Sequence, residues 1–143
     1  MTLTDDKLRQ IWTDTKVIAC IGASPNPARP SHYVSQFLRE RGYRVIPVNP
    51  GQAGAQLFGE TVVATIADLP AEVDMIDVFR NSAHVAGVVE AALAHLPALH
   101  TIWTQLGVQD DAAAAKARAQ GIHVVQNRCP MIEIPRLFGS GPV

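Results

Sequence analysis

Short apolar segments alternate with helical patterns along almost the whole chain. Five apolar segments predict strands, at residues 16–21, 44–48, 74–79, 100–103 and 122–125. The segments between them predict helices at residues 31–41, 82–95 and 109–120, the last ended by a glycine. This alternation predicts an α/β fold with a mostly parallel sheet. Right-handed crossovers then make the sheet an open, doubly wound, Rossmann-like one.

The chain has the length of one ordinary domain. Its 143 residues are enough to bury a core without disulfides. We predict an N-terminal helix within residues 1–15 that packs on the domain and is capped by Thr4. One side of this helix carries three apolar residues, Leu8, Ile11 and Trp12. The Rossmann-like domain is expected to cover residues 16–137, and a C-terminal tail residues 138–143.

Composition narrows the classes of function. Apolar residues make up 48% of the chain and charged residues 17%, as in globular proteins. Lysine and arginine number 12 against 13 acidic residues, so no broad positive field favours nucleic acid as a partner. No apolar run approaches the roughly 20 residues that cross a bilayer, and the first residues do not resemble a secretory signal. We therefore expect a cytoplasmic protein with neither a membrane nor a nucleic-acid partner.

Turn formers and polar residues follow each predicted strand. In a doubly wound sheet, ligands bind at the carboxyl ends of the strands, where the strand order reverses. The longest of these segments is GASPNPARPS, residues 22–31, after the first strand. The second strand is followed by Asn-Pro-Gly, the third by Arg-Asn-Ser and the fourth by Gln-Leu-Gly. These segments are the candidates for a binding site.

The segment after the first strand does not match the nucleotide-binding fingerprints. An NAD site calls for G-x-G-x-x-G and for an acid at the end of the second strand. Here Gly22 is the one glycine of the three, and Asn49 takes the place of the acid. The Walker pattern, which ends in G-K-[ST], is missing as well. A bound NAD is therefore disfavoured.

The same segment still suits a phosphate. Gly22 allows close approach of the backbone, Ser24 supplies a hydroxyl and Arg29 can reach an anion. The N–H groups and dipole at the start of the helix near Ser31 favour negative charge. Prolines at 25, 27 and 30 stiffen the loop. The alternative is a rigid connection in which Ser31 caps the helix and Arg29 lies in solvent.

Four stretches of the chain, taken together, resemble a known family. They are IGASPNPARPSHYVSQFLRERGYRVIPVNP, VDMIDVFRNS, TQLGV and NRCPMIEIPRL, in that order. The chain resembles the single-domain CoA-binding proteins of bacteria, relatives of the nucleotide-binding domain at the amino end of the succinyl-CoA synthetase alpha subunit. The resemblance runs from about residue 13 to residue 137. It implies that CoA lies across the carboxyl edge of the sheet.

The resemblance also implies where the phosphates lie. Gly22, Ala23 and Ser24 would approach the pyrophosphate of CoA. Arg29 and Ser31 would lie close to it.

The remaining implied contacts lie on the neighbouring strands. Asn49 and Pro50 would border the adenosine end, where CoA carries a ribose phosphate in place of the free hydroxyls that call for an acid. Phe79 would pack against the adenine or the pantetheine arm, and Arg80 would pair with a phosphate. Gln105, after the fourth strand, is a candidate for a polar contact in the crevice.

The sequence departs from the family pattern near its end. Relatives carry an Asp-Arg-Cys-x-Lys-Ile-Glu run, whereas Asn127 and Met131 replace the acid and the lysine here. Either this chain holds its ligand differently, or a salt bridge between the two positions has been lost. The sequence leaves both interpretations open.

Other reactive side chains give little sign of catalysis. Cys129 lies at the end of the last strand, where a thiol could form a mixed disulfide with CoA or act as a nucleophile. A quiet, half-buried thiol is the favoured interpretation, and Cys20 is expected to be a small core residue. His32 lies near the proposed phosphate loop, but a surface role is favoured. The other histidines are scattered without a metal-binding pattern, so no metal site is predicted.

The remaining polar and aromatic candidates in the strands are assigned to structure. Asp74 and Asp77 point to opposite faces of the third strand and do not form a carboxylate pair. Asp77 is expected at the strand terminus, bonded to loop amides. Trp103 is expected in the core.

We therefore predict a stand-alone protein that binds CoA or acyl-CoA, with no catalytic residue assigned. The ligase reaction of the synthetases, which needs a second domain with a phosphorylated histidine, is not expected. An NAD(P)-dependent oxidoreductase on the same fold is one alternative. A thiol-based redox or sensor protein that acts through Cys129 is another, and a homo-oligomer is possible.

Overall fold

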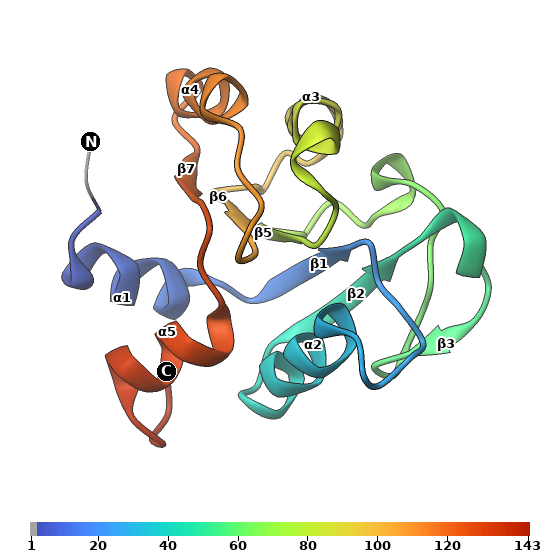
Figure 1. Cartoon of the computed structure of the whole chain (residues 1–143), viewed down its shortest axis with the longest axis horizontal. Helices are drawn as coiled ribbons and strands as arrows, with labels where there is room; N and C mark the ends of the chain where they lie inside the picture. Colours follow the sequence, from blue (N-terminus) through green and yellow to red (C-terminus); the bar gives the residue numbers. More distant parts are fainter. Residues whose placement is uncertain (1–2) are drawn as a thin grey trace.

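The protein is built around one five-stranded sheet, shown in Figure 1 as a computed structural model that describes residues 3–143. All neighbouring strands are parallel, in the order β2-β1-β5-β6-β7. The strands are β1 (Val17–Ile21), β2 (Arg44–Val48), β5 (Met75–Val78), β6 (Thr101–Thr104) and β7 (His123–Val125). The predicted doubly wound α/β fold is confirmed.

Helices cover both faces of the sheet. They are α1 (Asp5–Asp14), α2 (Pro30–Glu40), α3 (Val85–His95), α4 (Asp111–Ala119) and α5 (Pro130–Phe138). Figure 1 shows α3 and α4 on one face and α1, α2 and α5 on the other. Within residues 3–143, no helix is both long enough and apolar enough to cross a membrane.

The alternation of side chains along each strand produces two separate cores. In β1, Ala19 points to the core beneath α3 and α4, whereas Ile18 and Cys20 point to the core beneath α1, α2 and α5. Trp103 lies in this second core with no exposed surface, 4.8 Å from the ring of Trp12. The core role predicted for Trp103 is confirmed, and Cys20 is likewise fully buried.

The order of the strands reverses between β1 and β5. From β1 the chain crosses to β2 on one side, and it then returns to β5 on the other side of β1. The connections that leave β1 and β5 therefore diverge at the carboxyl edge of the sheet. This geometry opens a crevice beside the ends of these two strands.

Two elements were not predicted from the sequence. Helix α5 begins with a proline at residue 130 and ends at Gly139, whose φ of 65° suits a residue without a side chain. A small antiparallel hairpin, β3 (Gln56–Leu57) and β4 (Glu60–Thr61), follows β2. These elements are too short for their periodicity to stand out in the sequence. The chain also forms single turns of 3-10 helix, η1 (Pro50–Gln52), η2 (Ile66–Asp68) and η3 (Ser82–His84).

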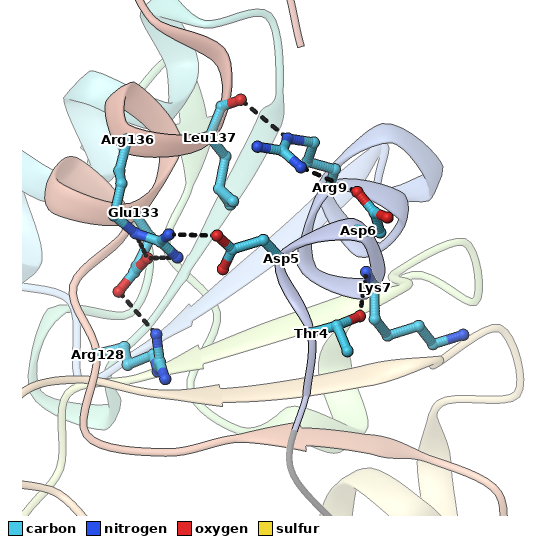
Figure 2. Close-up of polar contacts among 9 residues, drawn as sticks. All are labelled: Thr4, Asp5, Asp6, Lys7, Arg9, Arg128, Glu133, Arg136 and Leu137. Atoms are coloured by element: carbon cyan, nitrogen blue, oxygen red, sulfur yellow. Dashed lines mark hydrogen bonds and ion pairs between the residues drawn. The ribbon is translucent and has the colours of Figure 1, made fainter.

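Helix α1 is fixed to the domain through α5. The hydroxyl of Thr4 accepts the N–H of Lys7 at 3.1 Å, as its predicted capping role requires. Figure 2 shows Arg9 donating to the carbonyl of Leu137, and the carboxylate of Asp5 facing Arg136 at 2.8 Å. Helices α1 and α5 are therefore held together.

The structure corrects the prediction for Asp77. The loop amides are bonded by Asp74 instead, which accepts the N–H groups of Lys16 and Val17 at 2.9 and 3.0 Å. Asp77 lies inside β5, is 1% exposed, and its carboxyl has no hydrogen-bond partner within residues 3–143. The reason is register, because Asp77 pairs with Cys20 in the middle of the sheet.

Candidate functional site

The turn after β1 is fixed by its own backbone. Gly22 has a φ of 90°, a conformation that side chains disfavour. The N–H groups of Gly22 and Ala23 both donate to the carbonyl of Val48, at 3.0 and 3.2 Å. These two amides therefore tie the turn to β2, and a ligand would compete with that bond.

Two other amides of the connection remain free. The N–H groups of Ser24 and Ser31 donate to no group within the described residues. Ser31 lies in the first turn of α2, where N–H groups have no helical partner. Both amides belong to residues that line the same cavity, so the connection can offer two donors to an anion.

The segment between these serines is held in place by short-range bonds. The hydroxyl of Ser24 accepts the N–H of Asn26, and the side chain of Asn26 accepts the N–H of Ala28. His32 contacts the carbonyl of Ser24 at 2.9 Å, and its ring packs edge-on against Phe58. His32 is therefore a half-buried anchor of the loop rather than the surface residue that we expected.

Arg29 stands at the start of α2. It is the residue before the first helical position, a place that the sequence analysis considered for Ser31. Ser31 is instead inside the helix and 5% exposed. The Arg29 side chain is exposed and, in the described part of the chain, forms no salt bridge. Its guanidinium is available for a ligand.

Asn49 holds the turn from the second strand. Its amide nitrogen donates to the carbonyl of Ala23 at 2.7 Å, and its oxygen accepts the N–H of Gly51 at 2.9 Å. The nitrogen and the oxygen of the side-chain amide thus each form a bond within the turn. A carboxylate at this position could not donate to Ala23, so the amide is required by the turn itself.

Eight of the ten predicted site residues surround one cavity of about 430 Å³ at the carboxyl edge of the sheet. They are Gly22, Ala23, Ser24, Arg29, Ser31, Asn49, Phe79 and Gln105. Pro50 does not line the cavity, because it begins η1 and leads the chain away. Arg80 does not line it either. A Cβ atom on Gly22 would lie 3.1 Å from the Arg80 Cδ, so the stem of Arg80 runs along the turn.

Three residues of the cavity wall were missed. Pro30 is the first residue of α2, whereas Leu106 and Val108 follow β6. Leu106 is 54% exposed, which is unusual for a leucine. The sequence analysis already treated the stretch TQLGV as a motif. Its leucine was the one sign in the sequence that this segment belongs to the cavity wall. Together with Phe79, these residues make one side of the cavity apolar.

The cysteines do not form part of this site. Cys129 is 8% exposed and does not line the cavity. Cys20 is completely buried, and burial and the nearby Asp77 raise the pKa of its thiol. Within residues 3–143, no group of three potential metal ligands comes together. The geometry thus offers binding groups for an anion rather than a nucleophile.

A family model described as a CoA binding domain matches residues 16–135. The chain belongs to this family. The match covers the sheet, the cavity and most of α5. It supports the resemblance on which the sequence analysis relied.

Known proteins of similar sequence and structure agree with this assignment. The chain is 32% identical to the uncharacterized protein YneT of Bacillus subtilis, over 86% of this chain and 88% of YneT. A solved Thermus thermophilus protein, cell-free ID.343, is 41% identical, with a TM-score of 0.89 over 95% of this chain and all of that chain. A dinucleotide-forming acetyl-coenzyme A synthetase 1 from Ca. Korarchaeum cryptofilum is 21% identical, with a TM-score of 0.62 over 76% of this chain and 25% of that chain. The last likeness is one of fold alone.

Of the two departures from the family pattern, only Asn127 contacts the loop that carries cavity residues. Asn127 has a φ of 59°, and its side-chain oxygen accepts the N–H of Gly107 at 2.7 Å. This bond ties the residues after β7 to the loop that carries Leu106. Met131 lies on the surface of α5 and is 37% exposed. Neither side chain lines the cavity.

Proposed function

We propose that this protein binds coenzyme A or an acyl-CoA in the cavity at the ends of β1, β5 and β6. The observation that carries the proposal is the donor set of the cavity. Within residues 3–143, the amides of Ser24 and Ser31 and the guanidinium of Arg29 have no partner, and all three residues line the cavity. Among the cavity-lining residues of the described chain, Arg29 is the one with a charge.

The donor set fits the pyrophosphate of CoA. Phosphate oxygens accept hydrogen bonds from backbone N–H groups at a helix start, and a guanidinium forms two parallel bonds with them. The three prolines at 25, 27 and 30 restrict the loop, so less conformational entropy is lost when it holds a ligand. Arg80, beside the turn, is positioned to strengthen the positive potential.

The apolar side of the cavity fits the pantetheine arm. Phe79, Leu106 and Val108 form a wall next to the polar loop. A ligand with an anionic head and a less polar arm satisfies both halves of the cavity, whereas inorganic phosphate uses only one. The exposed surface of Leu106 would be covered by the ligand.

The second-strand turn argues against NAD. An NAD site holds the ribose hydroxyls with a carboxylate at the end of the second strand. Here the corresponding Asn49 is neutral and already forms bonds to Ala23 and Gly51 within the turn. NAD would find no carboxylate at this position. The fold alone would permit either cofactor.

A calorimetric titration of the purified protein with CoA, dephospho-CoA, NAD, NADP and inorganic phosphate tests the proposal. We expect CoA to bind most tightly, and free phosphate to compete only weakly. Ligands that bind the folded state also raise the unfolding temperature, which gives an independent measurement. Tighter binding of NADP than of CoA would replace the proposal with the oxidoreductase alternative.

A further inference from the structure

Asp77 in the sheet and Gln105 at the cavity are two of the buried polar side chains that have no hydrogen-bond partner in the described part of the chain. Both carboxyl oxygens of Asp77 lack one, and so does the Oε1 atom of Gln105. The residues are 1% and 8% exposed. A buried polar atom without a partner costs about 1–3 kcal/mol, so groups of this kind are normally satisfied.

The two side chains lie on the same face of the sheet, on neighbouring strands. Asp77 on β5 pairs in register with Trp103 on β6. Gln105 comes two residues after Trp103, and its N–H still donates to the carbonyl of Val78 at 3.1 Å. Side chains two residues apart on an extended chain point the same way. Gln105 therefore points to the face on which Asp77 lies, one step closer to the cavity.

A hydrogen bond from Asp77 toward Gln105 Oε1 requires a proton on the Asp77 carboxyl. The Gln105 Oε1 atom only accepts hydrogen bonds, and an ionised carboxylate also only accepts them. Burial raises the pKa of Asp77 well above its ordinary value and so favours the neutral acid, which can donate one hydrogen bond.

The surroundings of Asp77 supply no competing charge. On β1 it faces the thiol of Cys20, whose pKa burial raises, so the thiol is neutral too. On β6 it pairs in register with Trp103, and the α2 residues Ser31 and Ser35 contact the thiol of Cys20. Burial alone raises the pKa of Asp77, and no charged neighbour contributes to the change.

We propose that Asp77 is a positioning residue of the ligand site, which donates a hydrogen bond to a buried water that in turn donates to Gln105 Oε1. That bond turns the NH₂ group of Gln105 toward the cavity. The cavity wall then presents a donor to the ligand beyond the loop, suited to a carbonyl or phosphate oxygen. This inference rests on the proposed function and assigns Gln105 its role within it.

A double-mutant cycle tests the inference through the dissociation constant for CoA. We expect Asp77→Leu and Gln105→Leu each to weaken binding about tenfold, the equivalent of one oriented hydrogen bond. The double variant should bind no more weakly than Gln105→Leu alone, because Asp77 acts through Gln105. Asp77→Asn, whose amide donates the same bond, should restore most of the affinity. Ser35→Ala, which removes a neighbouring buried hydroxyl, is the matched control.

Several results would overturn the inference. They are a full additional loss in the double variant, Asp77→Asn binding as weakly as Asp77→Leu, or an equal loss in Ser35→Ala. A carbon-detected NMR titration gives a readout that needs no ligand. The Asp77 carboxyl must be protonated at pH 7, and the side-chain NH₂ resonances of Gln105 must shift in Asp77→Leu more than in Asp77→Asn. If the wild-type protein does not bind CoA, the proposed function fails, and these resonances still decide whether the pair exists.

Discussion

The side-chain amide of Asn49 donates to the carbonyl of Ala23 at 2.7 Å, which joins the turn after β2 to the turn after β1. The bond explains why an asparagine stands where dinucleotide-binding folds carry an acid. Asn49 therefore stabilises the connection between β1 and α2, whichever ligand binds there.

Replacing Asn49 should therefore weaken both the fold and the site. Asn49→Ala loses the bonds to Ala23 and Gly51, and we expect the free energy of unfolding to fall by about 1–2 kcal/mol. Asn49→Asp keeps the acceptor but places a carboxylate against a carbonyl, so CoA affinity should drop as well. Urea denaturation and calorimetry measure the two effects. Wild-type affinity in Asn49→Asp would show that the turn does not depend on this amide.

The guanidinium of Arg29 should contribute directly to the affinity for phosphate. Arg29→Ala is expected to weaken CoA binding by about 1–3 kcal/mol, because a charge-assisted bond is lost. The unfolding temperature should stay the same, since Arg29 forms no salt bridge within the described residues. Lys116→Ala, an exposed cation on α4, is the control. Equal losses in both variants would indicate a general charge effect.

Gly22 should not tolerate a side chain. Gly22→Ala must hold a φ of 90° and bring its Cβ to 3.1 Å from the Arg80 Cδ, so we expect a loss of about 1–2 kcal/mol in unfolding free energy. Gly87→Ala is the matched control, because this glycine lies inside α3 with open space around it. The control should be neutral or stabilising. Equal stability of the two variants would contradict the argument.

Glu133 should be important for the attachment of α1 and α5. Its carboxylate is 7% exposed and bonds Arg128 at 3.0 Å and Arg136 at 2.7 Å, as Figure 2 shows. Glu133→Gln weakens both bonds, and we expect a loss of about 1–2 kcal/mol by chemical denaturation. Asp6→Asn, at an almost fully exposed salt bridge to Arg9, should have no measurable effect.

Asp77 should make the stability depend on pH. Its pKa is raised in the folded state by burial, so its contribution is fully present below the unfolded pKa of about 3.9 and is lost as pH rises toward the folded pKa. The free energy of unfolding of the wild type, relative to Asp77→Asn, should therefore fall as pH rises above 4, by up to about 1.4 kcal/mol per pH unit. Denaturation series of both proteins from pH 4 to 8 measure the difference. A difference that stays constant with pH would show that the carboxyl ionises normally.

The fold could be predicted from the sequence to a large extent. The strands were recognisable because parallel strands buried on both faces consist largely of apolar runs, as in residues 17–21 and 45–48. Helix α1 was recognisable from Thr4 and the spacing of its apolar residues. Helix α5 was not, because Pro135 lies inside a segment of only nine residues.

The candidate site was predictable only in outline. Loops that follow neighbouring strands of a parallel sheet lie at the same edge of the sheet. This rule predicted that Gly22, Asn49 and Phe79 lie close together. The sequence could not predict that Pro50 and Arg80 do not line the cavity, because this depends on the path of each side chain and not on its place in the chain.

The sequence by itself determined the order of the elements, the parallel sheet and the edge at which a ligand would lie, because periodicity and turn residues act locally. Tertiary structure decided which amides are free, that Asn49 supports the loop, and that Asp77 is sealed between β1 and β6 instead of capping a turn. These outcomes depend on register and burial, which arise only when segments distant in the chain pack against one another.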